Sequence, residues 1–164
     1  MSVDQSPYAV PNANLVADSS KDNGISQLPR FSAWGVFFLT LITLGIYYYI
    51  WMYKRTKVIN TVCNKKIPTG LTNTAISLYI INFLMNIYIG AVGEGVDSSV
   101  IMVENIISIV AVILSIIWLY TIRNRLHVIE NVSKDSKFWI GGILTFFFST
   151  IYLQYKINQM IDEK

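Results

Sequence analysis

The sequence predicts an all-α, polytopic membrane protein with four transmembrane helices. Hydrophobic residues make up 53% of the 164 positions and charged residues only 14%, compared with about 25% charged residues in ordinary soluble domains. The charges are clustered, so they leave long neutral runs, and a run of about 20 apolar residues can cross a bilayer. Because hydrocarbon offers the backbone no hydrogen-bond partner, each run is expected to be helical.

The first apolar segment follows a polar tail. Residues 1–30 are rich in Ser, Asn and Pro and are expected to be disordered, which leaves residues 31–164 for the four-helix domain. Between Arg30 and Lys54, 23 residues carry no charge. Trp51 follows Trp34 by 17 residues, which corresponds to roughly 26 Å of helix, about the distance between the two interfaces of a bilayer. We therefore interpret the following residues as interfacial aromatics: Trp34, Tyr49, Trp51, Tyr53, Trp118 and Tyr120.

Three further neutral segments complete the prediction. The second covers approximately residues 75–92, and the third covers residues 100–122 with Glu104 one turn inside its start. The fourth consists of the 18 residues between Lys137 and Lys156, or roughly 27 Å of helix. The loop between the second and third segments is short, at residues 93–99, so these two helices are expected to form an antiparallel hairpin.

The distribution of Lys and Arg predicts the orientation, because cytoplasmic loops carry an excess of these residues. With the N-terminus outside, four spans place nine of them in the cytoplasm and four outside, and the reverse orientation exchanges these numbers. The alternative is two spans plus two re-entrant segments. Gly45 would break the first segment and Gly141–Gly142 would loosen the fourth, which would place both tails and all 13 basic residues in the cytoplasm.

Small and polar residues recur on one face of the second and third segments. Spacings of three and four residues place Asn82, Asn86 and Gly90 on one side of a helix. The same spacings align Ser108 and Ser115 on the next helix. Such residues pack membrane helices together, so we predict that the two stripes face each other. The functional interpretation of the same stripes is a polar path or a small-ligand pocket.

A short phrase recurs at the ends of three segments. The triplets WMY at 51–53 and WLY at 118–120, and the tetrapeptide LQYK at 153–156, each precede an amphipathic stretch. Amphipathic helices of this kind lie along a membrane surface, where basic residues attract anionic lipids. We therefore predict lipid headgroup contacts from Lys54, Arg55, Lys57, Arg123 and Arg125.

The first of these phrases also carries a family resemblance. The stretch TLITLGIYYYIWMYKRTKVIN resembles the signature of the domain-of-unknown-function 4234 family, which consists of small bacterial membrane proteins. The later stretch FWIGGILTFFFSTIYLQYKINQMID is similar to a weaker closing copy, so the resemblance covers most of residues 31–162. It implies a multi-pass protein of the bacterial inner (plasma) membrane and supplies no catalytic residues.

The motifs favour a non-enzymatic function. The sequence has no Ser–His–Asp arrangement, no His-Glu-x-x-His motif and no phosphate-binding glycine loop. Its one histidine, His127, lacks a nearby Cys or carboxylate cluster, so we expect neither a metal nor a cofactor. The basic residues flank apolar segments, which indicates membrane lipids rather than nucleic acid as partners. We predict an accessory or scaffold protein that interacts with lipids, with a homo-oligomer or membrane-protein partner, and an oligomeric channel or transporter component as the alternative.

Overall fold

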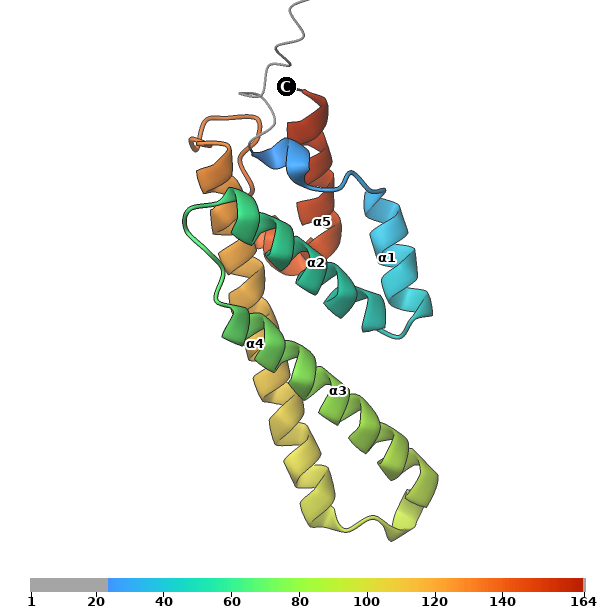
Figure 1. Ribbon diagram of the computed structural model, residues 1–164. Helices are drawn as coiled ribbons and strands as arrows, with labels where there is room; N and C mark the ends of the chain where they lie inside the picture. Colours follow the sequence, from blue (N-terminus) through green and yellow to red (C-terminus); the bar gives the residue numbers. More distant parts are fainter. Residues whose placement is uncertain (1–23, 164) are drawn as a thin grey trace, which may run out of the picture.

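The computed structural model describes residues 24–163, and this part of the chain is all-α with five α-helices (Figure 1). Two short 3₁₀ turns accompany them: η1 (Ile25–Gln27) precedes the first helix and η2 (Gly93–Gly95) follows the third. The α-helices are α1 (Ala33–Ile42), α2 (Ile46–Val62), α3 (Thr69–Val92), α4 (Ser98–Ile129) and α5 (Gly142–Asp162).

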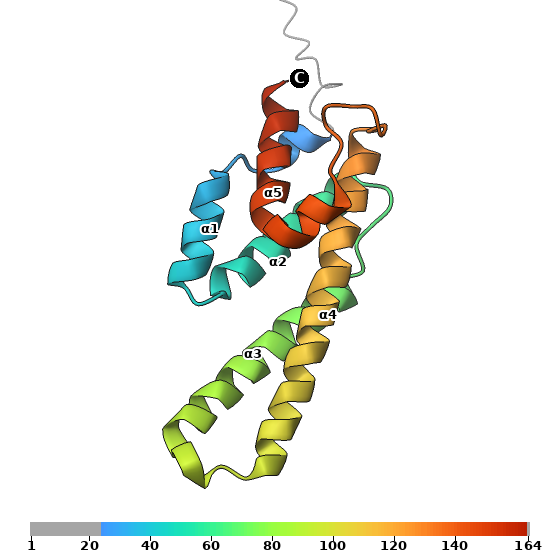
Figure 2. The ribbon, with the colours of Figure 1, turned by 180° about the vertical axis from the view of Figure 1, so that it is seen from behind.

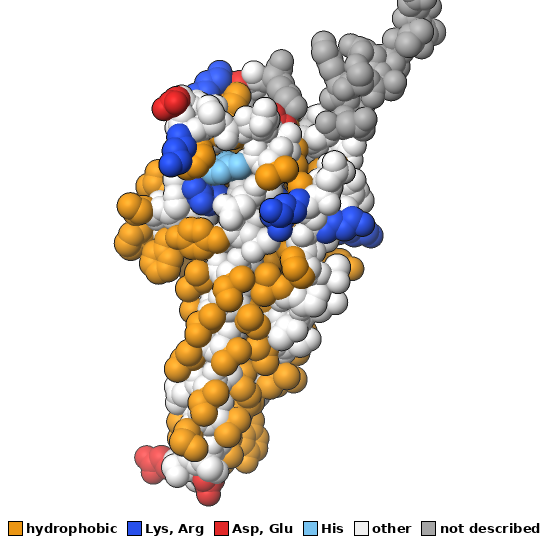
Figure 3. All heavy atoms as spheres, turned by 90° about the vertical axis from the view of Figure 1, so that its left-hand side faces the viewer, with side chains coloured by type: hydrophobic (Ala, Val, Ile, Leu, Met, Phe, Trp, Pro, Cys, Tyr) orange, Lys and Arg blue, Asp and Glu red, His pale blue; other side chains and the backbone are white. Residues whose placement is uncertain are grey.

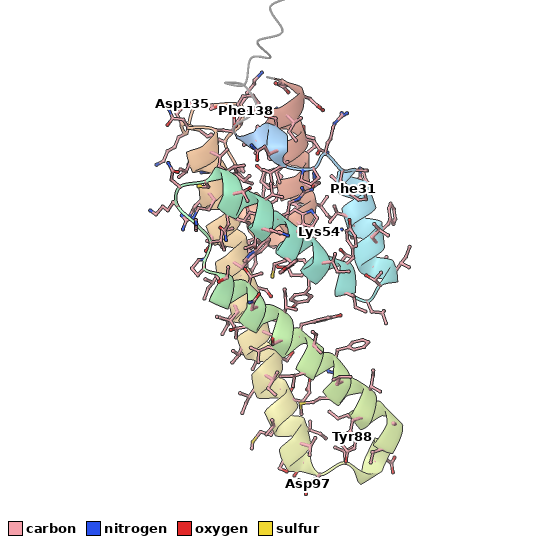
Figure 4. The ribbon with its side chains drawn as sticks, viewed as in Figure 1. Phe31, Lys54, Tyr88, Asp97, Asp135 and Phe138 are labelled. Atoms are coloured by element: carbon pink, nitrogen blue, oxygen red, sulfur yellow. The ribbon has the colours of Figure 1, made fainter. Side chains whose placement is uncertain are left out.

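The molecule has two parts, which we call the head and the hairpin. The head consists of α1, α2, α5 and the part of α4 that follows Ser115, and the hairpin consists of α3 and the preceding part of α4 (Figures 1 and 2). The hairpin projects from one end of the head, and its tip is the turn between α3 and α4. Figure 4 shows Asp97 at this tip and Asp135 at the opposite end of the molecule.

The two helices of the hairpin are long and apolar enough to cross a membrane. α3 has 24 residues and α4 has 32, or about 36 and 48 Å, against about 30 Å for the hydrocarbon core of a bilayer. Hydrophobic side chains cover the hairpin surface in Figure 3. The side chain of Asp97 caps the start of α4 by accepting a hydrogen bond from Ser99 N at 2.7 Å. The prediction of an antiparallel hairpin over the second and third segments therefore agrees with the fold.

The first predicted segment is divided into α1 and α2 by a sharp turn at Leu44 and Gly45. Both residues have positive φ, 50° and 92° respectively, and Gly adopts such a conformation at the lowest steric cost. The turn is closed by a hydrogen bond from Gly45 N to Thr40 O at 2.8 Å. Tyr79 Oη on α3 donates to Leu44 O at 2.8 Å, which fastens the turn to the hairpin.

One contact shows that the first segment doubles back. Arg55 Nη2 donates to Pro29 O at 2.7 Å. In a straight helix, residues this far apart in sequence would be separated by about 39 Å. The two ends of the first segment therefore lie together at the head, which a single span would place on opposite sides of a membrane.

The fourth predicted segment is also interrupted. α5 begins only at Gly142, and Ser149 inside it has non-helical dihedrals, φ 44° and ψ −124°. The sequence pointed to Gly141–Gly142 as the weak point, whereas the bend lies seven residues later at a position without glycine or proline. The structure therefore does not contain four continuous transmembrane helices over the predicted segments. Within the described residues, two helices are long and apolar enough to span a membrane.

Candidate functional site

The recurring phrase forms the core of the head. Trp51 is 3% exposed and Trp118 is fully buried, and their ring centroids lie 5.9 Å apart in an edge-to-face arrangement. Leu153 occupies the position of the tryptophan in the third copy and is also fully buried. Both tryptophans therefore pack against protein in the head rather than standing exposed on its surface, and their predicted place at the membrane interface stays a prediction.

The other predicted interfacial aromatics have different surroundings. Trp34 on α1 is 66% exposed and Tyr53 on α2 is 53% exposed, so both can reach lipid. Tyr49 stacks on Tyr79 of α3 with ring centroids 4.1 Å apart. Tyr120 is half-buried, and its hydroxyl donates to the carbonyl oxygen of Gly142, the first residue of α5, at 3.1 Å.

A buried cation lies beside the tryptophan pair. Arg55 is 3% exposed, which corrects the prediction that it contacts lipid headgroups. Its Nη2 atom donates to Gln154 Oε1 at 2.6 Å as well as to Pro29 O, and Gln154 Oε1 also accepts from Trp51 Nε1 at 3.0 Å. Within the described residues, Nε and Nη1 of Arg55 have no hydrogen-bond partner. Burial lowers the pKa of this guanidinium to about 10, so it remains a cation at neutral pH.

A second buried network joins the head to the hairpin. Trp118 Nε1 on α4 donates to Thr56 Oγ1 on α2 at 2.9 Å. The hydroxyl groups of Thr56 and Thr72 lie 3.3 Å apart and link α2 to α3. Buried polar groups require such partners, so these hydrogen bonds fix the angle at which the hairpin leaves the head.

The two arginines of α4 are held by backbone carbonyls. Arg123 Nε donates to Ile140 O at 2.7 Å, and its guanidinium lies over the ring of Trp139, 5.4 Å from the centroid. Arg125 Nη2 donates to Lys66 O at 3.4 Å. Both side chains are half-buried, so they anchor the loops at residues 63–68 and 130–141 as well as carrying charge. Their predicted headgroup contacts stay a prediction.

The polar stripes meet inside the hairpin. Asn82 Nδ2 and Asn86 Nδ2 on α3 donate to the same oxygen of Glu104 on α4, Oε1, at 2.8 and 3.0 Å. Asn86 Nδ2 also lies 3.2 Å from Asn82 Oδ1. The three side chains therefore form one hydrogen-bonded cluster within the apolar part of the hairpin, about 9 Å along α4 from its start.

The remaining stripe residues are not part of this cluster. The hydroxyl groups of Ser115 and Tyr49 lie 3.5 Å apart at the junction of head and hairpin. Ser108 is half-buried on α4. Gly90 on α3 is open, since a Cβ atom built on it would meet no atom within 4 Å. The stripe is thus divided between a cluster near the tip and a contact near the head.

A groove of about 1010 Å³ lies between α2 and α3. Its outer end carries the predicted lipid-contact residues Lys54 and Lys57, both exposed, and the polar residues Asn73 and Ser77. Its walls are otherwise mainly apolar and aromatic, and none of its lining residues is acidic. Figure 4 shows Lys54 on α2. This groove is the best-formed candidate site among the described residues.

The stretch that contains the first two copies of the recurring phrase matches a known protein family. The model described as "Domain of unknown function (DUF4234)" matches residues 31–128, more than half of the chain. The chain belongs to this family. Comparison with curated proteins and with solved structures finds no match.

The DUF4234 match confirms the predicted family and covers most of residues 31–162. The matched residues contain α1, α2, α3 and nearly all of α4, and they stop before α5. The closing copy at 138–162 therefore lies outside the match. Sequence reasoning missed Gln154, the acceptor for both Arg55 and Trp51, although the third phrase marked its position.

Proposed function

We propose that this DUF4234 protein is a non-enzymatic, lipid-interacting scaffold of the bacterial inner membrane. In this proposal α3 and α4 span the bilayer, and α1–α2 and the start of α5 form two re-entrant segments in one leaflet. The contact between Arg55 Nη2 and Pro29 O carries the proposal, because it holds the two ends of the first segment at the same side.

The charge distribution supports a cytoplasmic head. Apart from Lys21 and Lys164, which lie outside the described residues, every Lys and Arg belongs to the head or its loops. The tip of the hairpin carries the acidic residues Glu94 and Asp97 instead, as Figure 3 shows. Because cytoplasmic segments are enriched in Lys and Arg, this asymmetry favours a cytoplasmic head and a tip on the outer side.

Exposed apolar side chains support insertion of both interrupted segments. Around the α1–α2 turn, Ile42 and Leu44 are 75% and 76% exposed. At the start of α5, Ile143 and Phe147 are 76% and 73% exposed. Water penalises such exposure by about 25 cal/mol per Å² of apolar surface, whereas hydrocarbon does not. Non-helical backbone is tolerated at membrane depth where protein covers it, and Tyr79 covers the carbonyl of Leu44.

The basic face of the head supplies the lipid interaction. Each Lys or Arg near an anionic leaflet contributes about 1 kcal/mol of attraction. The exposed lysines Lys54, Lys57, Lys65 and Lys66 lie along α2 and the following loop. We expect the full chain in vesicles to enrich anionic over zwitterionic lipid around itself, measured as energy transfer from tryptophan to labelled lipids. Enrichment that is absent at low ionic strength would refute a lipid-organising function.

The orientation is tested separately. The reporters are proteins that are active only in the cytoplasm. Fused to the N-terminus or to the C-terminus, such a reporter is expected to be active. Spin labels at Leu44 and Phe147 in proteoliposomes should be accessible to oxygen and shielded from a water-soluble nickel reagent, whereas a label at Asp97 should show the reverse. An N-terminus on the outer side, or a label at Leu44 that is open to water, would contradict the re-entrant arrangement.

The cluster at Glu104 supports one alternative, an oligomeric channel or transporter component. A carboxylate in a membrane segment often marks an ion path, and Asn86 beside it is exposed at the surface of the hairpin. Several copies around these residues would line a polar path. Native mass spectrometry of the full chain in detergent tests this alternative, because a strict monomer excludes a pore built from two spanning helices.

A further inference from the structure

The groove between α2 and α3 has a polarity gradient along its length. On α2 it runs from Ile46 at the turn to Lys57, and on α3 from Leu84 to Asn73. The end near Ile46 and Leu84 is apolar, and the end near Lys57 and Asn73 is polar. From Ile46 to Lys57 and from Asn73 to Leu84, each wall covers 12 residues along its helix, an axial length of about 16 Å. This length is about half of the 30 Å hydrocarbon core, so the groove is as deep as one leaflet.

Aromatic rings line the apolar half of the groove. Tyr49 of α2 and Tyr79 of α3 stack across it with ring centroids 4.1 Å apart. Tyr79 also stacks on Phe83, another lining residue, with centroids 6.1 Å apart. The hydrogen bond from Tyr79 Oη to Leu44 O holds the two helices at this end. The groove is therefore a preformed recess and not a gap between loosely packed helices.

The polar end of the groove carries positive charge without a counter-charge. Within the described residues, neither Lys54 nor Lys57 forms an ion pair, and the lining contains no Asp or Glu. Asn73 and Ser77 add neutral hydrogen-bonding groups beside them. Two cations and two neutral polar side chains at the edge of an apolar recess form a complement to an anionic headgroup attached to acyl chains.

We propose that this groove binds one anionic glycerophospholipid of the cytoplasmic leaflet. The phosphate lies between Lys54 and Lys57, and acyl chains follow Ile50 and Ile80 towards Phe83. The orientation of the lipid rests on the proposed cytoplasmic head. A zwitterionic lipid is disfavoured, because its ammonium group would lie beside the same two lysines. The site differs from general enrichment of lipid around the head, since it holds a single molecule in a recess of about 1010 Å³.

The test is native mass spectrometry of the full chain in detergent with added dioleoyl phosphatidylglycerol or dioleoyl phosphatidylcholine. Wild-type protein is expected to retain one phosphatidylglycerol. The double variant Lys54→Gln/Lys57→Gln should bind it about 30-fold more weakly, or about fivefold per lysine. Lys65→Gln/Lys66→Gln is the matched control, because it removes the same charge from exposed lysines outside the groove. In detergent, where no bilayer surrounds the head, this control should change retention of the single lipid less than twofold, because Lys65 and Lys66 do not line the groove.

A second pair of variants tests the apolar part of the groove. Ile80 and Ile113 are each 50% exposed on a hairpin helix, but only Ile80 lines the groove. Ile80→Trp should fill the recess and lower retention of both lipids at least tenfold, whereas Ile113→Trp should leave retention unchanged. Thermal unfolding of both variants in detergent shows whether each is folded, and an Ile80→Trp protein that is folded and retains lipid overturns the proposal.

Other results that overturn the proposal are equally clear. They are equal retention of the two lipids by wild-type protein, equal loss in both lysine pairs, or a dimer in place of a lipid-bound monomer. A dimer would identify a second copy of the chain as the occupant. If the protein retains lipid only after residues 1–23 are removed, those residues are the occupant of the groove. If anionic lipid is still enriched around the protein in vesicles, the proposed scaffold function is retained even though the groove site is refuted. Failure of the groove proposal can therefore be distinguished from failure of the proposed function.

Discussion

Gln154 is the residue whose replacement should destabilise the head most. Its Oε1 atom accepts from two buried donors, Arg55 Nη2 at 2.6 Å and Trp51 Nε1 at 3.0 Å. Gln154→Leu keeps a similar volume but removes both acceptor contacts at once. The Arg55 guanidinium would then keep only its hydrogen bond to Pro29 O, and the indole N–H of Trp51 would lose its partner.

The expected cost follows from these two losses. A hydrogen bond to a charged group contributes about 1.5–3 kcal/mol, and a buried donor left without an acceptor costs about 1–3 kcal/mol. We therefore expect Gln154→Leu to lower the free energy of unfolding by about 3–5 kcal/mol, as for other changes that strand a buried charge. The double variant Arg55→Met/Gln154→Leu should cost less than Gln154→Leu alone, because it removes the stranded charge.

The assay is unfolding of the full chain in mixed micelles by titration with a denaturing detergent, followed by circular dichroism. Gln159→Leu is the control on the same helix, since the side chain of Gln159 bonds only to the half-buried Lys156 and the exposed Glu163 in the described residues, and it should cost less than about 1 kcal/mol. A double variant less stable than Gln154→Leu would refute the reasoning, because Arg55 would then stabilise the head without its Gln154 contact.

Four further changes follow from the backbone and the second buried network. Gly45→Ala should lower the free energy of unfolding by about 1–2 kcal/mol because φ is 92° there, whereas Gly90→Ala, in an open helix position, should raise it by about 0.5–1 kcal/mol. Ser149→Gly should stabilise the bend in α5 by about 1 kcal/mol, since Ser149 has φ 44°. Thr56→Val should cost about 1–3 kcal/mol by leaving Trp118 Nε1 without its acceptor. Detergent-titration midpoints check all four, and an unchanged midpoint for Gly45→Ala or Thr56→Val contradicts the corresponding argument.

The hairpin could be predicted from the sequence because local signals determine it. Long neutral runs mark α3 and α4, and the helical period places Asn82 and Asn86 on one face. The structure brings both amides to Glu104 of the neighbouring helix. The neutral runs, the helical period and the short connection that makes the two helices antiparallel are all local features. Predicting the hairpin therefore required no information about residues far away in the chain.

The head could not be predicted in the same way, because apolar composition does not distinguish a lipid-facing helix from one buried in protein. Trp51 and Trp118 suit an interface and a core equally well, and their burial depends on contacts between segments about 65 residues apart. Arg55 resembles a basic residue at the end of a span until Gln154, almost 100 residues later, supplies its acceptor. Ser149 gave no signal, since neither glycine nor proline marks the bend.

In the proposed membrane orientation, the difference in width between the head and the hairpin affects how lipids pack around the protein. The head contributes segments of α1, α2, α4 and α5 at one end, whereas only α3 and α4 reach the other end (Figure 1). In the proposed orientation, the protein displaces more lipid from the cytoplasmic leaflet than from the outer leaflet and so has the shape of a wedge. Such a shape fits best where the membrane is convex towards the cytoplasm, so bilayer curvature becomes a variable that sorts this protein within the membrane.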